Sequence, residues 1–277
     1  MTLLRSHPLN DGYTIPPVGF GTWPLDDDQA ERAVTQAIRL GYRLIDTAAR
    51  YENETGVGRA LRGAEVAREQ LFVTTKLRGR DHGFDATLRA FDASLGKLGL
   101  DYVDHYLIHW PLPARGLYVE SWKAMVRLRK DGRVRSLGVS NFEPEHLTRL
   151  IDETGVVPAI NQIELHPAFA QPALRAFHAQ HGIVTEAWGP LGRGRGYLDS
   201  PALVQIAERV GRSAAQVVLR WHLELGNVVI PKSSDPGRMA QNLALFDFAL
   251  DDEALTALGA LDRGARLGPD PASHEEL

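Results

Sequence analysis

The sequence predicts an α/β fold of the (β/α)8 TIM-barrel class, with an N-terminal β-hairpin and extra helices near the C-terminus. Two observations lead to this prediction. Eight short runs of apolar and β-branched residues alternate with longer amphipathic stretches along the 277 residues, which is the element order of such a barrel. No linker rich in Pro, Gly or Ser divides the chain, so we expect residues 1–277 to form a single domain.

The candidate strands are short and bounded by turn-forming residues, as strands of a barrel are. In chain order they are 18–22, 43–47, 71–76, 103–109, 134–140, 159–165, 182–188 and 227–232. Ahead of them, the first seventeen residues contain the turn signal "NDG". This signal predicts a β-hairpin that plugs the bottom of the barrel.

The stretches between the strands have helical periodicity. In 28–41, apolar residues recur at helical spacing from Ala30 to Ile38, and Gly41 ends the helix. The segment 84–100 is a second example. Two more helix candidates, 201–210 and 213–225, lie between the last two strands, so we expect one of them to be an insertion.

The last stretch, from Leu261 on, is rich in Gly and Pro. It is therefore predicted to be a loop, placed where it can lie over the active face.

The composition excludes several function classes. The chain has no cysteine, so thiolate zinc sites, thiol nucleophiles and disulfides are ruled out. Lys and Arg number 31 and Asp and Glu 35, for a net charge of -4, which argues against nucleic acid or an anionic membrane as a partner. The N-terminus lacks the apolar core of a signal peptide and no apolar run is long enough for a membrane span, so we expect a cytoplasmic protein.

In a barrel of this class, catalytic groups come from the carboxyl ends of the strands and the loops that follow them. That rule selects a polar and aromatic set: Asp46, Tyr51, Lys76, His109, Trp110, Ser140, Asn141, Gln162, Trp188 and Lys232. Each member also has a structural explanation. An Asp often bonds to a turn, a Lys can extend to solvent, and a single His is often a rim residue.

Taken together, four of these residues suggest proton chemistry. A buried Lys76 beside Tyr51 would lower the pKa of the phenol, and Asp46 can pair with the Lys and hold it in place. A Tyr tuned in this way can donate a proton to a carbonyl oxygen during reduction. A neutral His109 can orient the carbonyl with a second hydrogen bond.

Seven motifs occur in the order and spacing of a known family: "GFGTW", "LIDTAARYENE", "TTK", "LIHWP", "GVSNF", "NQIELHP" and "IPKSSDPGRMAQN". From about residue 8 to residue 270 the chain resembles the aldo-keto reductase family, and is most similar to its bacterial branch that includes 2,5-diketo-D-gluconate reductases. The resemblance makes Asp46, Tyr51, Lys76 and His109 a catalytic tetrad, with Tyr51 as the general acid. It implies a monomer without a metal that uses NADPH to reduce small-molecule aldehydes and ketones.

The resemblance also assigns a cofactor site. Ser140, Asn141 and Gln162 would hold the nicotinamide carboxamide, and Trp188 would stack on the ring, although a core role fits Trp188 equally. The loop 189–196 would pass over the pyrophosphate. The whole assigned set is Gly21, Thr22, Trp23, Asp46, Ser140, Asn141, Gln162, Trp188, Gly189, Leu191, Gly192, Arg193, Lys232, Ser233, Ser234, Arg238, Gln241 and Asn242. The substrate pocket would be lined by Trp23, Tyr51, His109 and Trp110.

Two positions depart from the family pattern. Asp235 stands where many members have Thr, next to the expected pocket for the 2′-phosphate, and Gln241 replaces a common Glu beside the adenine. An acid near the 2′ position is typical of NADH enzymes. Lys232 and Arg238 favour the phosphate, and the sequence therefore predicts NADPH with a reduced margin over NADH.

Three other readings are weaker. A Rossmann-type enzyme would use "GVGRAL" (56–61), but the third glycine and a directly preceding strand are absent. A metal-dependent barrel hydrolase needs clustered ligands, and "ELH" (164–166) offers one pair. A non-catalytic, NADP-binding redox-sensing barrel is the third, and the intact tetrad argues against it.

Overall fold

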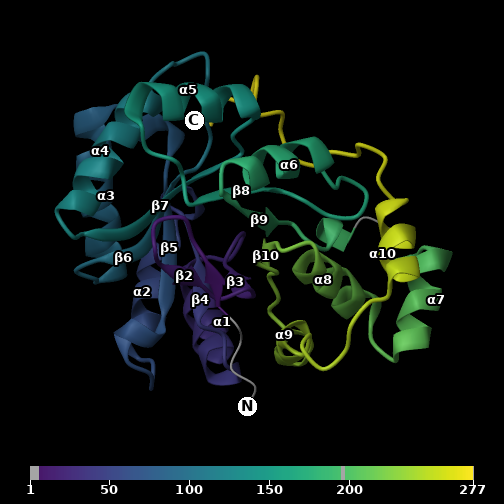
Figure 1. Cartoon of the computed structure of the whole chain (residues 1–277). Coiled ribbons are helices and arrows are strands. Elements are labelled where there is room, and N and C mark those ends of the chain that lie inside the picture. Colours follow the sequence, from purple (N-terminus) through teal and green to yellow (C-terminus); the bar gives the residue numbers. More distant parts are fainter. Residues whose placement is uncertain (1–5, 195–196, 277) are drawn as a thin grey trace.

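A computed structural model describes residues 6–194 and 197–276. Eight parallel strands, β3 to β10, stand side by side in chain order, and helices surround them (Figure 1). A parallel bridge between Val18 and Val229 joins the first strand to the last. The predicted barrel is therefore confirmed.

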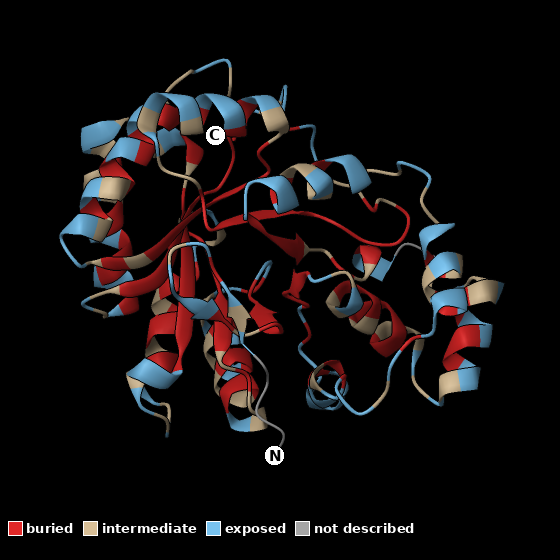
Figure 2. Ribbon diagram, in the orientation of Figure 1, coloured by how far each residue is buried: buried red, intermediate tan, exposed pale blue. Residues whose placement is uncertain are grey.

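Each of the eight predicted strand segments overlaps an observed strand, which is usually shorter, and only β5 extends beyond its predicted segment, by one residue. The strands are β3 (Gly19–Gly21), β4 (Leu44–Asp46), β5 (Phe72–Leu77), β6 (Val103–Ile108), β7 (Val134–Ser140), β8 (Ile160–Glu164), β9 (Val184–Trp188) and β10 (Val228–Val229). Most of their residues are buried, because the barrel interior and the helix layer cover both faces (Figure 2).

The N-terminal hairpin is also present. β1 (His7–Pro8) pairs antiparallel with β2 (Thr14–Ile15). Leu9 and Ile15 of this hairpin share a buried cluster with apolar residues near the amino ends of the strands, including Leu44 and Phe72. The hairpin therefore closes the bottom of the barrel with side chains, as predicted.

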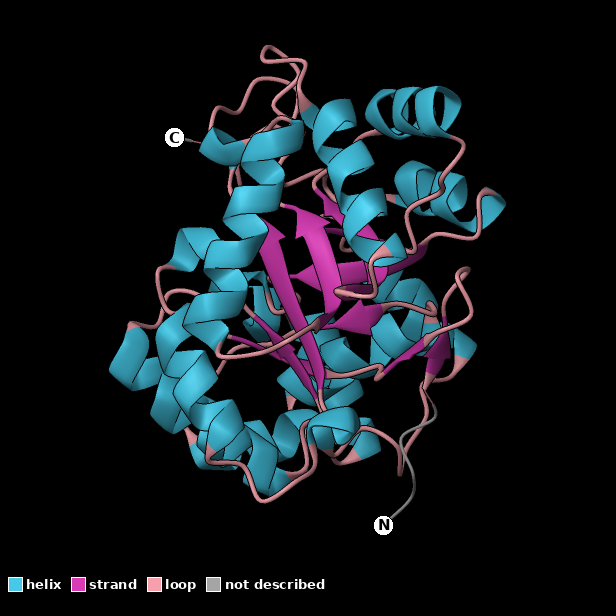
Figure 3. Ribbon diagram, turned by 90° about the vertical axis from the view of Figure 1, so that its left-hand side faces the viewer, coloured by secondary structure: helices cyan, strands magenta, loops and turns pink. Residues whose placement is uncertain are grey.

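The helices cover the outside of the strands (Figure 3). They are α1 (Asp27–Leu40), α2 (Glu54–Arg62), α3 (Phe84–Leu98), α4 (Tyr118–Lys130), α5 (Pro144–Thr154), α6 (Pro172–Gln180), α7 (Pro201–Val210), α8 (Ala214–Glu224), α9 (Pro236–Leu243) and α10 (Asp252–Gly259). The two helices expected between the last strands are α7 and α8, and α10 packs on α7. No helix in the described part of the chain is long and apolar enough to cross a membrane.

The glycines of "GVGRAL" have a packing role in α2. A Cβ atom on Gly56 would collide with the backbone of Asp27 in α1, and one on Gly58 with the backbone oxygen of Leu98 in α3. The Gly56 N–H also donates to Asp27 Oδ1 at 2.6 Å. This pair of glycines therefore lets three neighbouring helices approach closely, and needs no nucleotide to explain it.

This packing predicts that Gly58→Ala destabilises the fold. The added methyl group meets backbone, which cannot rotate away, so we expect a loss of about 1–3 kcal/mol in the free energy of unfolding. Gly96→Ala in α3 is the matched control, because a Cβ there meets nothing within 4 Å. It should gain roughly 0.5–1 kcal/mol from the better helix propensity of Ala. Urea unfolding of both variants tests this, and equal stabilities would contradict it.

Candidate active site

Four polar side chains meet at the carboxyl end of the barrel. Asp46 is the last residue of β4, Lys76 lies one residue before the end of β5, and His109 follows β6 directly. Tyr51 ends a 3-10 helix, Ala49–Tyr51, that follows β4. Parallel neighbouring strands end at the same edge of a sheet, and for that reason residues far apart in the sequence come together here.

The ammonium group of Lys76 lies at the centre of this set. Its Nζ donates to Asp46 Oδ1 at 2.6 Å, to the Thr47 backbone oxygen at 3.1 Å and to the Tyr51 hydroxyl at 3.2 Å. All three protons of the ammonium are used in this way. Lys76 is 0% exposed and Asp46 is 1% exposed, so each charge relies on the other for compensation.

The surroundings decide which of these groups are charged. Burial by itself lowers the pKa of Lys76, but the Asp46 carboxylate and Tyr51 raise it by more, and the net shift is upward. For Tyr51, burial raises the pKa, the charge of Lys76 lowers it, and the net shift is again upward. The prediction of a lowered phenol pKa is therefore wrong for this structure, because the loss of solvent outweighs the ammonium charge. The phenol keeps its proton at neutral pH.

His109 lies between Tyr51 and the C-terminal tail. The two rings meet edge to face, with their centroids 5.6 Å apart. His109 Nδ1 is 2.7 Å from Glu276 Oε1, and Glu276 Oε2 accepts from the Gly79 N–H at 2.6 Å. Burial tends to raise the pKa of Glu276, but His109 and the Gly79 amide bring it below its ordinary value. A tail carboxylate is thus held against the ring of His109.

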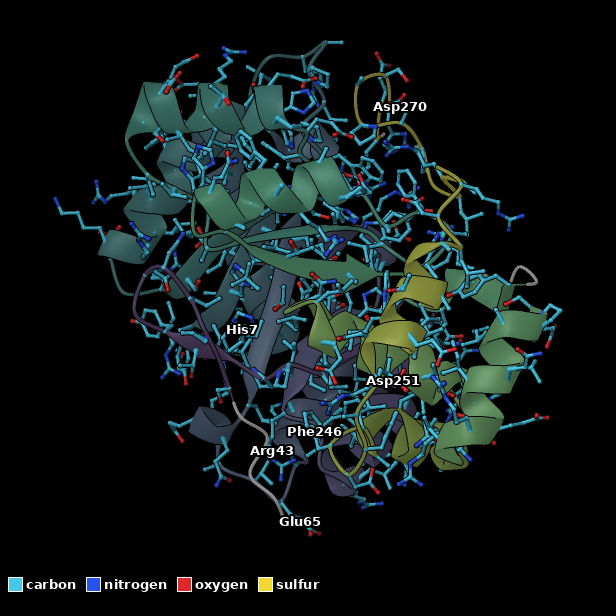
Figure 4. All side chains as sticks on the ribbon, turned by 45° about the vertical axis from the view of Figure 1, so that its right-hand side comes forward. His7, Arg43, Glu65, Phe246, Asp251 and Asp270 are labelled. Atoms are coloured by element: carbon cyan, nitrogen blue, oxygen red, sulfur yellow. The ribbon has the colours of Figure 1, made fainter. Side chains whose placement is uncertain are left out.

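The tail has a second attachment on the barrel. Glu164, the last residue of β8, accepts from the backbone N–H groups of Leu267 at 2.6 Å and Gly268 at 2.7 Å. Asp270 lies in the loop between the two attachments (Figure 4). The tail is therefore a loop at the active face, as predicted. Its residues that line the cavity are Pro269, His274, Glu275 and Glu276.

The site opens into a cavity of about 820 Å³. The four predicted substrate-pocket residues line it: Trp23, Tyr51, His109 and Trp110. Many of the predicted cofactor residues do so as well: Gly21, Thr22, Trp23, Asp46, Ser140, Asn141, Gln162, Trp188, Gly189, Leu191, Arg193 and Lys232. The residues predicted from the sequence therefore form one continuous wall of this cavity.

A strip of hydrogen-bonded polar groups crosses the middle of this wall. The Ser140 hydroxyl donates to the Gln162 backbone oxygen at 2.8 Å. Asn141 Nδ2 donates to the His109 backbone oxygen at 3.0 Å, and Asn141 Oδ1 accepts from Trp188 Nε1 at 2.8 Å. The Trp188 ring is thereby held at the cavity, and a purely internal packing role does not describe it.

The loop after β9 borders the next part of the cavity. The Arg193 guanidinium lies 5.0 Å from the ring centroid of Trp188 and 5.4 Å from that of Trp23, as cation–π pairs do. Gly192 has φ +61°, and a Cβ there would strike the ring of Tyr197. The remaining residues of the predicted loop, 195 and 196, lie outside the described residues.

The residues predicted to bind the 2′-phosphate and adenine surround the start of α9. Lys232, Ser234, Arg238 and Gln241 are exposed, while Ser233 and Asn242 are buried. Lys232 lines the cavity, and the other residues of this set lie beyond it.

Asp235 has a defined structural role next to this set. It is the N-cap of α9, where its Oδ1 accepts from the Arg238 N–H at 2.7 Å. Its carboxylate is therefore bound to its own helix, and a capping role accounts for an acid at this position.

Sequence reasoning missed two carboxyl groups at the site. Glu186 on β9 accepts from Gln162 Nε2 at 2.8 Å and is fully buried. It stands two residues before Trp188, so the alternation of side chains along a strand could have placed it on the same face. No sequence signal marks Glu276. Among the described residues, no group of three or more His, Asp or Glu side chains is placed to hold a metal ion.

The chain is similar to known proteins of one family. A model of the Aldo/keto reductase family matches residues 17–263. An aldo-keto reductase of Mycolicibacterium smegmatis is 56% identical over 263 residues, or 95% of both chains. Methylglyoxal reductase DkgA of Escherichia coli is 51% identical over 264 residues, again 95% of both chains.

Solved structures agree with these relatives. A Gox0644 variant in complex with NADPH has a TM-score of 0.94 at 49% identity, covering 98% of this chain and 99% of the other. The Bombyx mori aldo-keto reductase in complex with NADP has a TM-score of 0.90 at 38% identity, covering 97% and 96%.

The buried pair predicts a large stability effect for Lys76→Met. This change leaves the Asp46 carboxylate buried without its cation, and breaking such a pair costs about 3–5 kcal/mol in the free energy of unfolding. Lys123→Met is the matched control, because Lys123 and its partner Glu120 are 44% and 49% exposed. An exposed pair of this kind is worth at most ~1 kcal/mol. Comparable urea midpoints for the two variants would show that the Lys76 pair does not stabilise the fold.

Proposed function

The chain belongs to the aldo/keto reductase family, and we propose that it reduces aldehydes and ketones to alcohols with Tyr51 as the proton donor. It is an NADP-dependent oxidoreductase, and its cofactor is NADPH. One observation carries the assignment of the acid. The Tyr51 hydroxyl accepts a hydrogen bond from the buried Lys76 ammonium at 3.2 Å, so a positive charge lies where phenolate would form.

The residues of the chain provide the proton and hold the carbonyl. Bound NADPH supplies a hydride, and the carbonyl oxygen must gain a proton as its carbon is reduced. Tyr51 gives that proton, and the phenolate left behind is stabilised by Lys76, which Asp46 keeps charged. His109 lines the same cavity as Tyr51 and its ring meets that of Tyr51 edge to face, a position that suits a second hydrogen bond to the carbonyl oxygen. Tyr51, supported by Lys76 and Asp46, thus acts as the general acid, and His109 orients the carbonyl.

The middle of the cavity suits a nicotinamide ring. Ser140, Asn141 and Gln162 present hydroxyl and amide groups, which match a planar carboxamide. Trp188 presents a flat aromatic face, and its indole N–H already donates to Asn141. These groups are ordered by one another before any ligand arrives, and binding therefore costs little side-chain entropy. We propose that this strip holds the nicotinamide end of NADPH.

The start of α9 suits the phosphate at the other end of the cofactor. Lys232 and Arg238 supply positive charge, Ser233 and Ser234 supply hydroxyl groups, and the helix N-terminus favours an anion. Asp235 opposes these groups with its own charge, although its Oδ1 is already bonded to the Arg238 N–H. We therefore propose a preference for NADPH over NADH that is smaller than in a relative with Thr at this position.

The names of relatives, and not the shape of the cavity, suggest which substrate to test first. Relatives at 51% identity are named methylglyoxal reductase, so a small dicarbonyl is the first substrate to test. A panel of carbonyl compounds with NADPH and NADH would separate this function from that of a non-catalytic, redox-sensing barrel. That residues 1–277 act as one domain, as a cytoplasmic monomer, stays a prediction from the sequence.

The role of Tyr51 predicts a severe loss of activity in Tyr51→Phe. This change keeps the ring and removes the proton, so turnover should fall by about 10²–10⁴-fold, with NADPH affinity nearly unchanged. Tyr13→Phe is the matched control, because Tyr13 is 45% exposed on the N-terminal hairpin. Steady-state rates with methylglyoxal and NADPH measure the effect. Turnover within a few-fold of wild type in Tyr51→Phe would remove Tyr51 as the acid.

The phosphate site predicts a selective effect of Arg238→Ala. Losing one charge-assisted hydrogen bond should weaken NADPH binding by about ten- to a hundredfold and leave NADH nearly unchanged. Arg127→Ala on α4 is the control, since Arg127 is exposed and pairs with Asp131. Quenching of tryptophan fluorescence gives both dissociation constants. Tighter binding of NADH than of NADPH by the wild type would contradict the assignment.

A further inference from the structure

Glu186 is a buried acid for which the proposed mechanism has no role. It lies on β9, in register with Gln162 on β8 and with Val228 on β10. Its side chain is 0% exposed. Since Trp188 stands two residues later on the same strand, Glu186 points into the barrel one layer below the tryptophan.

Two carboxyl groups share the amide nitrogen of Gln162. Its Nε2 donates to Asp46 Oδ2 at 2.8 Å and to Glu186 Oε2 at 2.8 Å. An amide nitrogen carries two hydrogens, so both are used inside the barrel. The amide oxygen is the atom left for a ligand in the cavity that Gln162 lines.

This arrangement decides which end of the Gln162 amide a ligand meets. The nitrogen and the oxygen of an amide are close in size, and hydrogen bonding selects between the two orientations. In a reversed amide the oxygen would face the Asp46 carboxylate, and the nitrogen would lose its acceptors on both Asp46 and Glu186. Removing Glu186 takes away one of the two acceptors that oppose this reversal.

We propose that Glu186 is a positioning residue for the cofactor, which together with Asp46 holds the Gln162 amide with its oxygen toward the nicotinamide carboxamide. The inference rests on the proposed role of Gln162 at the nicotinamide end. An inward-facing nitrogen leaves an acceptor for the N–H of the carboxamide. Glu186 thus acts on cofactor binding without touching the cofactor.

The charges around Glu186 give the carboxyl a distinct protonation state. Asp46 from β4 is neutralised by Lys76 from β5, whereas Gln162 and Val228, the neighbours on β8 and β10, carry no charge. Glu186 Oε1 has no hydrogen-bond partner among the described residues. Burial, then the charge of Asp46, raises the pKa of Glu186 to about 8. The group is accordingly neutral at pH 7 and becomes a second buried anion beside Asp46 above pH 8.

A comparison of the affinities for two ligands separates the contribution of the nicotinamide from that of the rest of the cofactor. NADPH contains the carboxamide, and 2′-phosphoadenosine 5′-diphosphoribose lacks the nicotinamide and keeps the rest. Glu186→Leu should weaken NADPH by about three- to tenfold, the worth of one hydrogen bond, and leave the second ligand within about twofold. Glu54→Gln is the matched control, since Glu54 is another buried acid, bonded to Thr75 at 2.6 Å. Equal weakening of both ligands, or of neither, would overturn the proposal.

Glu186→Gln tests the same role in a variant that keeps an acceptor and the shape. At pH 7 its affinity for both ligands should match the wild type. Between pH 7 and pH 9 the wild type should gain NADPH affinity relative to the second ligand, because an ionised Glu186 can only accept from the Gln162 amide and no longer donate to a reversed one, while Glu186→Gln stays constant. The same pH dependence in both proteins would count against Glu186.

Gln162→Leu separates this inference from the proposed function. If Gln162→Leu weakens NADPH selectively and Glu186→Leu does not, the positioning role fails and the nicotinamide assignment stands. If Gln162→Leu leaves NADPH binding unchanged, the assignment of Gln162 fails, and the role of Glu186 fails with it.

Discussion

One buried cation organises this end of the barrel. Lys76 is fully enclosed, and all three of its ammonium protons are given to oxygen atoms on neighbouring segments. A charge in such a place is tolerated because Asp46 compensates it. The second oxygen of Asp46 accepts from Gln162, which also bonds to Glu186. Four strands, β4, β5, β8 and β9, are thereby connected through polar contacts around a single positive charge.

The protonation states follow from that charge. Two buried carboxyl groups, those of Asp46 and Glu186, lie near a single ammonium group, and the ion pair forms between Lys76 Nζ and Asp46 Oδ1 at 2.6 Å. Glu186 is left to carry a proton, and Tyr51 is left as a neutral phenol with a cation beside its oxygen. The fixed positive charge stabilises phenolate more than phenol, and so offsets part of the cost of burial when Tyr51 transfers its proton. The same interaction therefore serves stability and proton transfer.

The repeating parts of the molecule could be predicted from the sequence, and the single contacts could not. Strand order and the convergence of Asp46, Lys76 and His109 follow from periodicity, since every strand of a barrel ends at one face. The pKa shift of Tyr51 was predicted in the wrong direction, because burial is a property of the packed structure. The contact of Glu276 with His109 depends on the path of a loop, for which no periodic signal exists.

The C-terminal tail is attached at two points, Glu164 with the amides of Leu267 and Gly268, and Glu276 with Gly79 and His109. The first attachment uses backbone N–H groups of the tail, which every residue except proline possesses, whereas the second uses the side chain of Glu276. The positions between the two attachments, 269–275, can therefore change while the contacts of Glu164 and Glu276 keep the loop in place. Pro269, His274 and Glu275 of this segment line the cavity. Substitutions there would change which compounds can enter the cavity, while the four polar residues of the barrel stay the same.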